Sequence, residues 1–302
     1  MPAVSVVIPS RRGGRYLRES VESVRAQTFT DWECVIVADG CEEDLSDIER
    51  ADARVRIFTQ RQRGVAIARN VGIGHAHADL IALLDDDDRM LPDRLLAQFE
   101  AMKDEGVGLC HTQFRFIDAD GAVIRPGGSR ETQYADFLRS DGSFLLSSTM
   151  VRKSLIQAVG GFNSLLPMGE DLDLVYRIAR ETTLRFLPDV LVEYRSHGDN
   201  MWLNTAASSG DEVKSFLLQH RVMAQARGEE ENLRAIREGI RHVMSSRTEF
   251  ALHRAVAARA RRDYFAMVTA VMQAIAHSPL VTLRVITREQ RRTRRERTTI
   301  KP

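Results

Sequence analysis

Short apolar runs alternate with helical segments through the first hundred residues, and this alternation constrains the fold more than any other feature. Four runs have the length of buried strands: VSVVIP at 4–9, CVIVAD at 34–39, VRIF at 55–58 and LIALL at 80–84. Segments with helical periodicity lie at 15–27, 64–76 and 92–104, the last with a proline near its start. These repeated strand–helix units predict an α/β fold, with a mostly parallel sheet and helices on both faces.

Polar residues follow three of these strands at the point where each strand ends. They are Pro9, Ser10 and Arg11 after the first strand, Asp39 and Gly40 after the second, and Asp85 to Asp88 after the fourth. Because the carboxyl ends of parallel strands lie at one edge of a sheet, we expect these side chains to converge. Ligands of such sheets bind at this edge, so the three groups define a candidate site.

The run from Asp85 to Asp88 places four carboxylates directly behind an apolar strand. Their mutual repulsion means that a fold does not gather them for stability alone. Either the run is a solvated acidic loop, or a cation binds there. Mg²⁺ and Mn²⁺ prefer carboxylate oxygens and share their coordination with substrate phosphates, and the position at the sheet edge favours such a metal.

Other polar residues are open to two interpretations each. Asp39 can bond to the amides of a turn or contact a ribose or base. Arg69, within the helical segment 64–76, can face solvent or turn inward toward a phosphate. Glu170 and Asp171 open an amphipathic helix at 168–180, where the helix dipole alone favours carboxylates. His197, in the loop after a strand that starts near residue 190, is by itself typical of a surface histidine.

The rest of the chain changes character twice. Residues 107–160 indicate two strands joined by an Asp-Gly turn, then a strand, a helix and a Gly-Gly stop. Beyond about residue 205 the pattern is helical, and residues 284–301 hold seven Arg and one Lys against two Glu, a basic tail of net charge +6. We therefore predict two domains, 1–204 and a helical C-terminal region at 205–302.

Bulk composition narrows the classes of function. A net charge of +1 over 302 residues gives no argument for nucleic acid binding. Three cysteines without a CxxC pair indicate a reducing, cytoplasmic setting, and neither a signal peptide nor about 18 consecutive apolar residues is evident. The apolar segment 263–286 with its basic tail is compatible with peripheral contact at the inner membrane face, with a homodimer, or with an ordinary packed helix.

Six segments, in this order, resemble the inverting family 2 glycosyltransferases with the GT-A fold. They are VSVVIPS from 4, RYLRESVESVRAQTFTDWECVIVADG from 15, GVAIARNVGI from 64, LIALLDDDDRMLPDRL from 80, VGGFNSLLPMGEDLDLVYRIA from 159 and EYRSH from 193. The resemblance covers residues 3 to 200 or so, about two-thirds of the chain. It implies a GT-A, Rossmann-like nucleotide-diphospho-sugar transferase domain, followed by a helical appendage.

The resemblance also implies which residues bind the donor. Asp39 corresponds to the acid that contacts the nucleoside, and Pro9 and Ser10 line the same pocket. Arg69 matches an arginine placed near the diphosphate, and Asp86 lies near the ribose.

A second group of residues corresponds to the metal site and the general base. Asp85 and Asp87 are the ends of the DxD motif, with Asp87 as the ligand of a Mn²⁺ or Mg²⁺ ion. His197 lies where many relatives carry a histidine close to the metal or the diphosphate. Asp171 matches the general base, and Glu170, its partner in the ED pair, is grouped with Asp85 among the donor-binding residues.

Three stretches depart from the family pattern. PSRR at 9–12 replaces a PTYN-like start, Ala38 precedes Asp39 where a pair of acids is usual, and Cys41 stands where Ser or Thr is common. These departures leave UDP, GDP and dTDP donors open, with UDP favoured by family habit.

The predicted function is metal-dependent, inverting transfer of a sugar from a nucleoside-diphosphate donor. A glycan or lipid-linked glycan of the cell envelope or cell surface is the predicted acceptor. Two alternatives stay open: a GT-A nucleotide- or carbohydrate-binding protein that has lost catalysis, and a sugar-nucleotide pyrophosphorylase. The second alternative has a distant parallel in Gly13, Gly14 and Arg15, which follow the first strand.

Overall fold

The computed structural model describes residues 1–166, 168–197, 209–279 and 281–283. These residues form two compact units. The first holds the residues up to 197 except Leu138–Ser140, and the second holds those three residues and the helices from Ser209 onward. The predicted domain boundary after residue 204 and the predicted basic tail at 284–301 lie outside the described residues.

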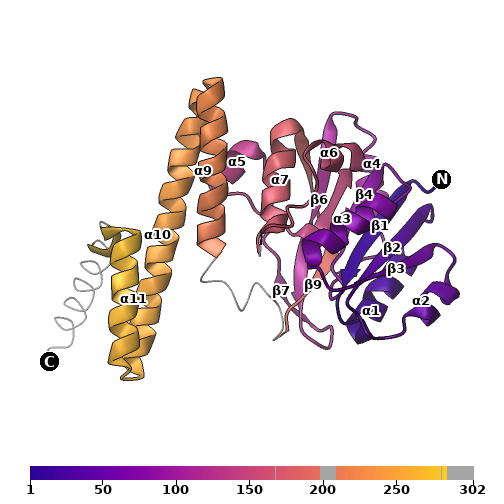
Figure 1. Cartoon of the computed structure of the whole chain (residues 1–302), viewed down its shortest axis with the longest axis horizontal. Coiled ribbons are helices and arrows are strands. Elements are labelled where there is room, and N and C mark those ends of the chain that lie inside the picture. Colours follow the sequence, from indigo (N-terminus) through magenta and orange to yellow (C-terminus); the bar gives the residue numbers. More distant parts are fainter. Residues whose placement is uncertain (167, 198–208, 280, 284–302) are drawn as a thin grey trace, which may run out of the picture. The chain divides into compact units, whose positions relative to one another are not determined.

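In the part of the chain that the structure describes, the first unit is built on one nine-stranded sheet (Figure 1). The strands are β1 (Val4–Ser10), β2 (Trp32–Asp39), β3 (Val55–Gln60), β4 (Leu80–Leu83), β5 (Arg89–Met90), β6 (Val107–Ile117), β7 (Val123–Pro126), β8 (Thr149–Arg152) and β9 (Thr183–Arg195). Their order is β3-β2-β1-β4-β8-β6-β9-β5, with β7 paired to β6. The sheet thus combines strands from the whole length of the unit.

The pairing divides this sheet into a parallel and a mixed half. β1 pairs in parallel with β2 and β4, and β2 with β3, as the strand–helix alternation predicted. β8 is antiparallel to both β4 and β6, β7 is antiparallel to β6, and β6 and β9 are parallel. A tight turn joins β6 to β7 at Gly121, whose φ is +90°, and such a turn produces an antiparallel pair.

Helices cover both faces of the sheet, as predicted. On one face α1 (Gly14–Arg25), α2 (Ser46–Ala51) and α4 (Arg94–Ala101) pack on the strands, with Leu17 and Leu95 in one core cluster with Ile8. On the other face α3 (Val65–His75) contacts β1 and β2. Gly72 permits this approach, because a Cβ there would lie 2.5 Å from Cγ1 of Val7. Alternate residues of β1 therefore pack against helices on opposite faces of the sheet.

Three further helices lie in the described part of the first unit, except for Leu138, the last residue of one of them, which falls in the second. They are α5 (Tyr134–Leu138), α6 (Lys153–Ala158) and α7 (Glu170–Glu181), with a 3₁₀ turn at Leu146–Ser148. α6 is followed by Gly160 and Gly161, both with positive φ, which confirms the predicted Gly-Gly stop. Gly169, with a φ of +78°, directly precedes α7. This left-handed residue turns the chain so that Glu170 and Asp171 open the helix.

The described part of the second unit includes the helices α9 (Ser209–Arg227), α10 (Glu230–Ala260) and α11 (Tyr264–His277), and so confirms a helical appendage (Figure 1). α10 packs against both α9 and α11. Ala251 and Leu252 of α10 form an apolar cluster with Ala274 of α11. Among the described residues, no helix is both long enough and apolar enough to cross a membrane.

Candidate active site

The loops after β1 and β4 bring predicted residues together at the carboxyl edge of the sheet. Ser10 ends β1, and its hydroxyl donates a hydrogen bond to Asp86, with Oγ 2.5 Å from Oδ2. Asp85 lies just beyond β4, and its backbone N–H donates to Oγ of Ser147 at 3.1 Å. Because β1 and β4 are parallel neighbours, the residues that follow them meet in space, as the sequence predicted.

Arg69 connects the two acidic segments of the site. Its side chain is 6% exposed, and its terminal nitrogens lie 2.7 Å from Oδ1 of Asp85 and 2.6 Å from Oε1 of Glu170. Of the two interpretations that the sequence left open, the structure shows the inward one. Desolvation opposes the charge of Arg69, but the carboxylates of Asp85 and Glu170 outweigh it and raise the pKa of Arg69 above its ordinary value.

The aspartate turn, residues 85–88, holds carboxylates whose charge is disfavoured. Burial raises the pKa of Asp86 to about 7, even though Ser10 donates a hydrogen bond to it. Burial, and then the charge of Asp85, raises the pKa of Asp87 as well. A bound cation would favour the ionised form of both groups. The run is therefore not an ordinary solvated loop.

Asp87 and His197, the metal ligands that the family resemblance implies, are neighbours. Oδ2 of Asp87 lies 3.0 Å from Nε2 of His197, and the ring of Tyr16 stacks on the imidazole with centroids 5.2 Å apart. Among the described residues, no group of three or more His, Cys, Asp or Glu side chains is arranged for a metal. Mg²⁺ binds through one or two carboxylates, waters and substrate phosphates. Two protein ligands beside a negative turn fit an ion that binds with a diphosphate.

Asp171 lies in the first turn of α7, beside Glu170. It is partly buried, and Oδ1 accepts the backbone N–H of Leu172 at 2.7 Å. Desolvation and then the charge of Glu170 raise the pKa of Asp171 to about 6, while Arg69 opposes this shift. A carboxylate in this range can accept a proton near neutral pH.

Asp39 has contacts that match the first of its two interpretations. Its carboxylate accepts the backbone N–H groups of Arg63 and Gly64 at 2.7 and 2.8 Å, and the side-chain amide of Gln60 at 2.8 Å. It therefore fixes the loop that leads into α3. Pro9 is buried in β1, opposite Val37 of β2. A nucleoside contact by either residue stays a prediction.

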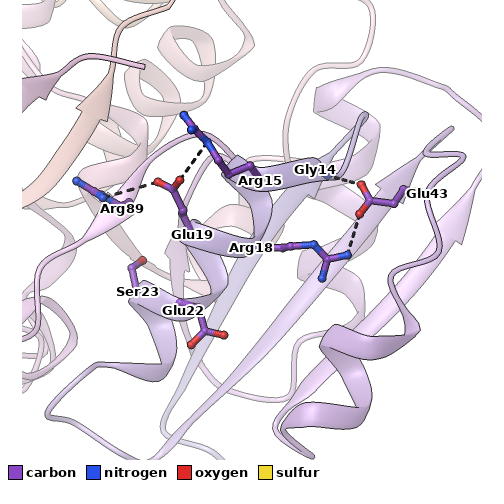
Figure 2. A pocket seen from close by; sticks show the side chains of 8 residues that line it. All are labelled: Gly14, Arg15, Arg18, Glu19, Glu22, Ser23, Glu43 and Arg89. Atoms are coloured by element: carbon purple, nitrogen blue, oxygen red, sulfur yellow. Dashed lines mark hydrogen bonds and ion pairs between the residues drawn. The ribbon is translucent and has the colours of Figure 1, made fainter. Parts of the chain in front are cut away.

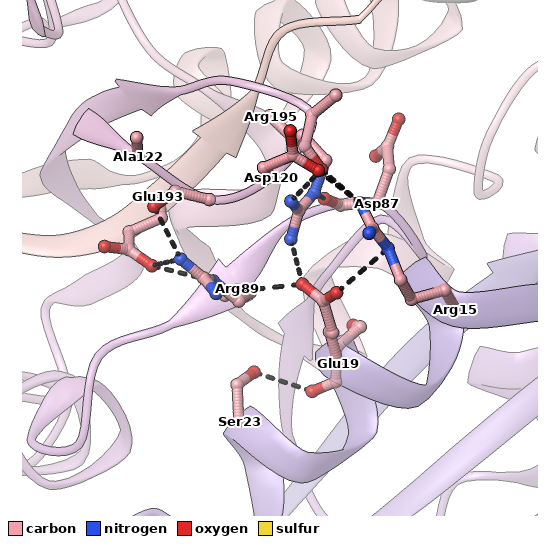
Figure 3. Close-up of polar contacts among 12 residues, drawn as sticks. Arg15, Glu19, Ser23, Asp87, Arg89, Asp120, Ala122, Glu193 and Arg195 are labelled. Atoms are coloured by element: carbon pink, nitrogen blue, oxygen red, sulfur yellow. Dashed lines mark hydrogen bonds and ion pairs between the residues drawn. The ribbon is translucent and has the colours of Figure 1, made fainter. Parts of the chain in front are cut away.

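Arg195, which the sequence did not single out, contacts the aspartate turn (Figure 3). Its side chain is 0% exposed, and one guanidinium nitrogen lies 2.5 Å from Glu19. Its Nε donates to the backbone oxygen of Asp87, and its backbone N–H donates to Oδ1 of Asp88, both at 3.0 Å. The available signal was the segment EYRSH, in which Arg195 precedes His197 by two positions. Sequence alone does not reveal which backbone atoms an arginine binds.

A cavity of about 660 Å³ lies beside α1 and has charged walls (Figure 2). Its lining residues are Gly14, Arg15, Arg18, Glu19, Glu22, Ser23, Glu43 and Arg89, and they include none of the predicted site residues. Glu19 lies 3.3 Å from Arg15 and 3.7 Å from Arg89, and Glu43 lies 2.8 Å from Arg18. These charges neutralise one another, so the cavity carries no strong net charge for an ionic ligand.

The family model for glycosyl transferase family 2 matches residues 5–158, just over half of the chain. The chain belongs to this family. It is 30% identical over 210 residues to the O-antigen biosynthesis glycosyltransferase WbnJ of Escherichia coli. The matched region covers 64% of this chain and 80% of that protein. Both matches confirm the resemblance seen in the sequence motifs.

Two further comparisons concern length and fold. An uncharacterized glycosyltransferase of Rickettsia bellii is 27% identical over 230 residues, which are 74% of this chain but 33% of that protein. The chain thus spans about a third of that relative. The crystal structure of TarS residues 1–349 from S. aureus, in complex with UDP-GlcNAc, matches with a TM-score of 0.60 at 14% identity over 92% of each chain. That likeness confirms the predicted GT-A fold class.

Proposed function

We propose that this chain is a metal-dependent, inverting glycosyltransferase. The donor is a nucleoside-diphosphate sugar, with a UDP-sugar favoured, and the acceptor is a glycan or lipid-linked glycan in the synthesis of a cell-envelope or surface polysaccharide. One observation carries the proposal: Arg69 contacts both Asp85 and Glu170, and so joins the aspartate turn to the helix that bears Asp171. Family membership and the O-antigen relative support it.

In this proposal the donor binds at the aspartate edge, by which we mean the carboxyl edge of the sheet around the aspartate turn. Asp87 and His197, whose side chains are neighbours, would hold a Mn²⁺ or Mg²⁺ ion that binds with the donor. When bound, the ion stabilises the negative charge that develops on the leaving diphosphate. Arg69 adds a permanent positive charge beside Asp85, at the same edge.

The nucleoside is assigned to the neighbouring strand ends. Ser10 and Asp86 are already hydrogen-bonded to each other, and we assign them to the ribose. Pro9 and Asp39 lie on the adjacent strands β1 and β2 and are assigned to the base. The TarS structure, which has the same fold and holds UDP-GlcNAc, supports a uridine donor as the first to try.

Asp171 acts as the general base. It takes the proton of the acceptor hydroxyl while the acceptor oxygen bonds to the anomeric carbon of the sugar. The bond from that carbon to the phosphate oxygen breaks, and the nucleoside diphosphate leaves with the electron pair. Attack from the face opposite the leaving group inverts the anomeric configuration, and no nucleophile of the chain is required. With a pKa of about 6, Asp171 is mostly ionised at neutral pH.

The proposal extends to organisation and setting. Residues 1–204 form the catalytic domain, and residues 205–302 form a helical region with a basic tail. Cys34 and Cys110 are buried free thiols, which supports a cytoplasmic setting.

The direct test is turnover of a donor. The purified full chain is incubated with UDP-, GDP-, dTDP- and CDP-sugars, each with Mn²⁺, Mg²⁺ or EDTA, and release of nucleoside diphosphate is measured. We expect release of nucleoside diphosphate from one donor class, and only when Mn²⁺ or Mg²⁺ is present. When an acceptor is supplied, we expect NMR to show an inverted anomeric configuration in the product. Asp171→Asn is expected to abolish transfer, while Glu105→Gln, an exposed acid that follows α4, serves as the matched control.

Three results would contradict parts of this proposal. A product with retained configuration would exclude direct displacement assisted by Asp171. Formation of a nucleotide-sugar from a sugar phosphate and a nucleoside triphosphate would favour the pyrophosphorylase. Binding of a donor without any turnover would favour the alternative of a nucleotide- or carbohydrate-binding protein that has lost catalysis.

A further inference from the structure

Helix α11 buries small side chains and exposes large apolar ones, which is the opposite of the usual arrangement. Small residues, Ala270 and Ala274, are buried toward the second unit's interior, where Ala274 meets α10. Large apolar residues are exposed instead: Phe265 at 86%, Met272 at 62% and Val268 at 54%. A helix that is covered on one side only is expected to bury its large apolar side chains and expose polar ones. α11 therefore presents a surface suited to a second contact.

The exposed side chains form one continuous stripe, here named the α11 apolar face. It consists of Tyr264, Phe265, Val268, Met272 and Ile275. The spacing of three and four residues places them on the same side of the helix. α11 contains no Asp, Glu, Lys or Arg between Tyr264 and His277. Exposed apolar residues that occur singly are common, but a charge-free stripe of this kind marks an interaction site.

Basic residues lie at both ends of this stripe in the sequence. Arg261 and Arg262, both exposed, come just before α11. Beyond the helix, residues 284–301 carry seven Arg and one Lys against two Glu. Asp263, the acid between the first arginines and the helix, accepts the backbone N–H of Ala266 and serves as its N-cap. The flanks are therefore strongly positive while the face between them is apolar.

This charge pattern discriminates between two occupants of the face. Arg261 and Arg262 are exposed beside the stripe, the sequence beyond α11 is basic as well, and α11 itself has no Asp, Glu, Lys or Arg. In a symmetric pair that used this face, both copies would bring these arginines to one interface, which places like charges together. An anionic bilayer instead attracts the arginines and accepts the apolar face beside them.

We propose that the α11 apolar face is a docking surface for an anionic lipid bilayer. The helix lies in the plane of the interface, with Phe265 and Met272 in the boundary between headgroups and acyl chains and Arg261 and Arg262 among the lipid phosphates. With 14 residues, α11 rests on such a surface rather than crossing it. The surface belongs to the helical unit and not to the sheet edge, so it goes beyond the proposed transfer reaction.

The test is flotation of the purified full chain with vesicles. One set contains phosphatidylcholine only, and the other contains phosphatidylcholine with phosphatidylglycerol. We expect binding to the anionic vesicles, weaker binding to the neutral ones, and a decrease when salt is raised. The double variant Phe265→Glu with Met272→Glu is expected to weaken binding to anionic vesicles by about tenfold or more, because two apolar groups are replaced by charges that the lipid repels.

A matched control is available outside α11. Val123 and Val222 are exposed at 56% and 66%, so the double variant Val123→Glu with Val222→Glu adds the same charge at other sites. We expect this control variant to retain at least half of the binding to anionic vesicles that the unchanged chain shows. Unfolding curves show whether each variant is folded, and Phe265→Ser is the milder substitute if the double glutamate variant is not.

The outcomes separate this proposal from the proposed function. No binding to anionic vesicles, or equal loss in both double variants, would overturn the docking surface. So would a dimer in light scattering that the α11 variant dissociates, since the occupant would then be a second copy. Turnover of a water-soluble acceptor is expected to be unchanged in the α11 variant, so a failure of docking leaves the transfer proposal standing.

Discussion

The two edges of the central sheet both carry buried carboxylates, and the pKa shifts at the two edges have opposite signs. At the amino edge, Glu33 lies at the start of β2 with a side chain that is 8% exposed. At the carboxyl edge, Asp86 and Asp87 follow β4 and are partly buried. The pKa of Glu33 is lowered, whereas the pKa values of both aspartates are raised.

Hydrogen-bond donors explain the amino edge. Burial alone would raise the pKa of Glu33, but four donor contacts outweigh it. Ser5 Oγ lies 2.6 Å from Oε1, Arg56 Nη2 lies 2.7 Å from Oε2, and the backbone nitrogen and Nδ1 of His77 lie at 2.5 and 3.0 Å. The ionised form is therefore favoured, and Glu33 contributes stability above its ordinary pKa that is lost as pH falls.

The carboxyl edge lacks this compensation. Asp86 receives one hydrogen bond from Ser10, and Asp87 contacts His197, yet burial and neighbouring negative charge still dominate. A site that only had to be stable would resemble the one around Glu33. The difference supports the proposal that the aspartate edge binds a cation together with a ligand, at a cost to the stability of the free protein.

The largest effect is expected from Asp171→Asn, which removes the base at the carboxyl edge without removing volume. Transfer should fall by roughly 10²–10⁴-fold, because that is the usual contribution of a positioned general base. Donor affinity should change little, since Asp171 is assigned to the acceptor. Steady-state kinetics with a competent acceptor gives both values. Full activity of Asp171→Asn would remove Asp171 from the mechanism.

Next in size is the loss of Glu33 at the amino edge. Glu33→Ala leaves the guanidinium of Arg56 and the hydroxyl of Ser5 without their partner, and we expect a loss of about 3 kcal/mol in the free energy of unfolding. Urea unfolding measures this, with Glu105→Ala as the exposed control. Donor turnover in the folded variant should be unchanged. A variant that is stable but inactive would show that the two edges are not separate in role.

A pH profile sharpens the comparison further. The pKa of Asp171 is raised to about 6, and the base must be ionised to accept a proton. The rate should therefore be level above that value and decline about tenfold per pH unit below it. Initial rates between pH 4.5 and 8, each at saturating donor, provide the profile, and buffer pairs at one pH control for buffer effects. A rate that rises as pH falls would assign Asp171 an acid role instead.

The smallest effect concerns stability at the aspartate edge. The pKa of Asp86 is raised from 3.8 to about 7, so the folded chain holds a proton that the unfolded chain releases in this range. This group therefore makes the fold less stable as pH rises from 4 to 7. Asp86→Asn should raise the free energy of unfolding at pH 8 in EDTA by about 1 kcal/mol, because solvent reaches this partly exposed carboxylate and screens much of the cost of its charge. It should have no such effect at pH 4. Destabilisation at pH 8 would show that its charge is already compensated.

The parallel half of the sheet was predictable because its strands are continuous apolar runs. β1, β2 and β4 are buried along their whole length, so the length and periodicity of their apolar runs were enough to predict them as strands. The mixed half was not predicted in detail, since the partners of β8 and β9 depend on tertiary packing rather than on local pattern. A single strand, β6, pairs with β7, β8 and β9.

The candidate site was predictable in the same partial way. The convergence of Ser10 with Asp86 follows from parallel strands that end at one edge. The contacts of Arg69 with Asp85 and Glu170 could not be predicted from the sequence, because an arginine in a helix can point toward solvent or toward the protein interior. Arg195 was missed altogether, since its bonds to the aspartate turn include backbone atoms that leave no trace in the sequence.

The central claim is that the aspartate edge binds a nucleoside diphosphate through a divalent ion. Thermal unfolding of the full chain with UDP, and with GDP, dTDP or CDP, in Mn²⁺, Mg²⁺ or EDTA, tests it most directly. At 100 times the dissociation constant, a bound nucleotide stabilises the fold by about 2.7 kcal/mol. We predict stabilisation by one nucleotide in metal only, and its loss in Asp87→Ala. Equal stabilisation in EDTA, or none with any nucleotide and metal, would contradict the claim.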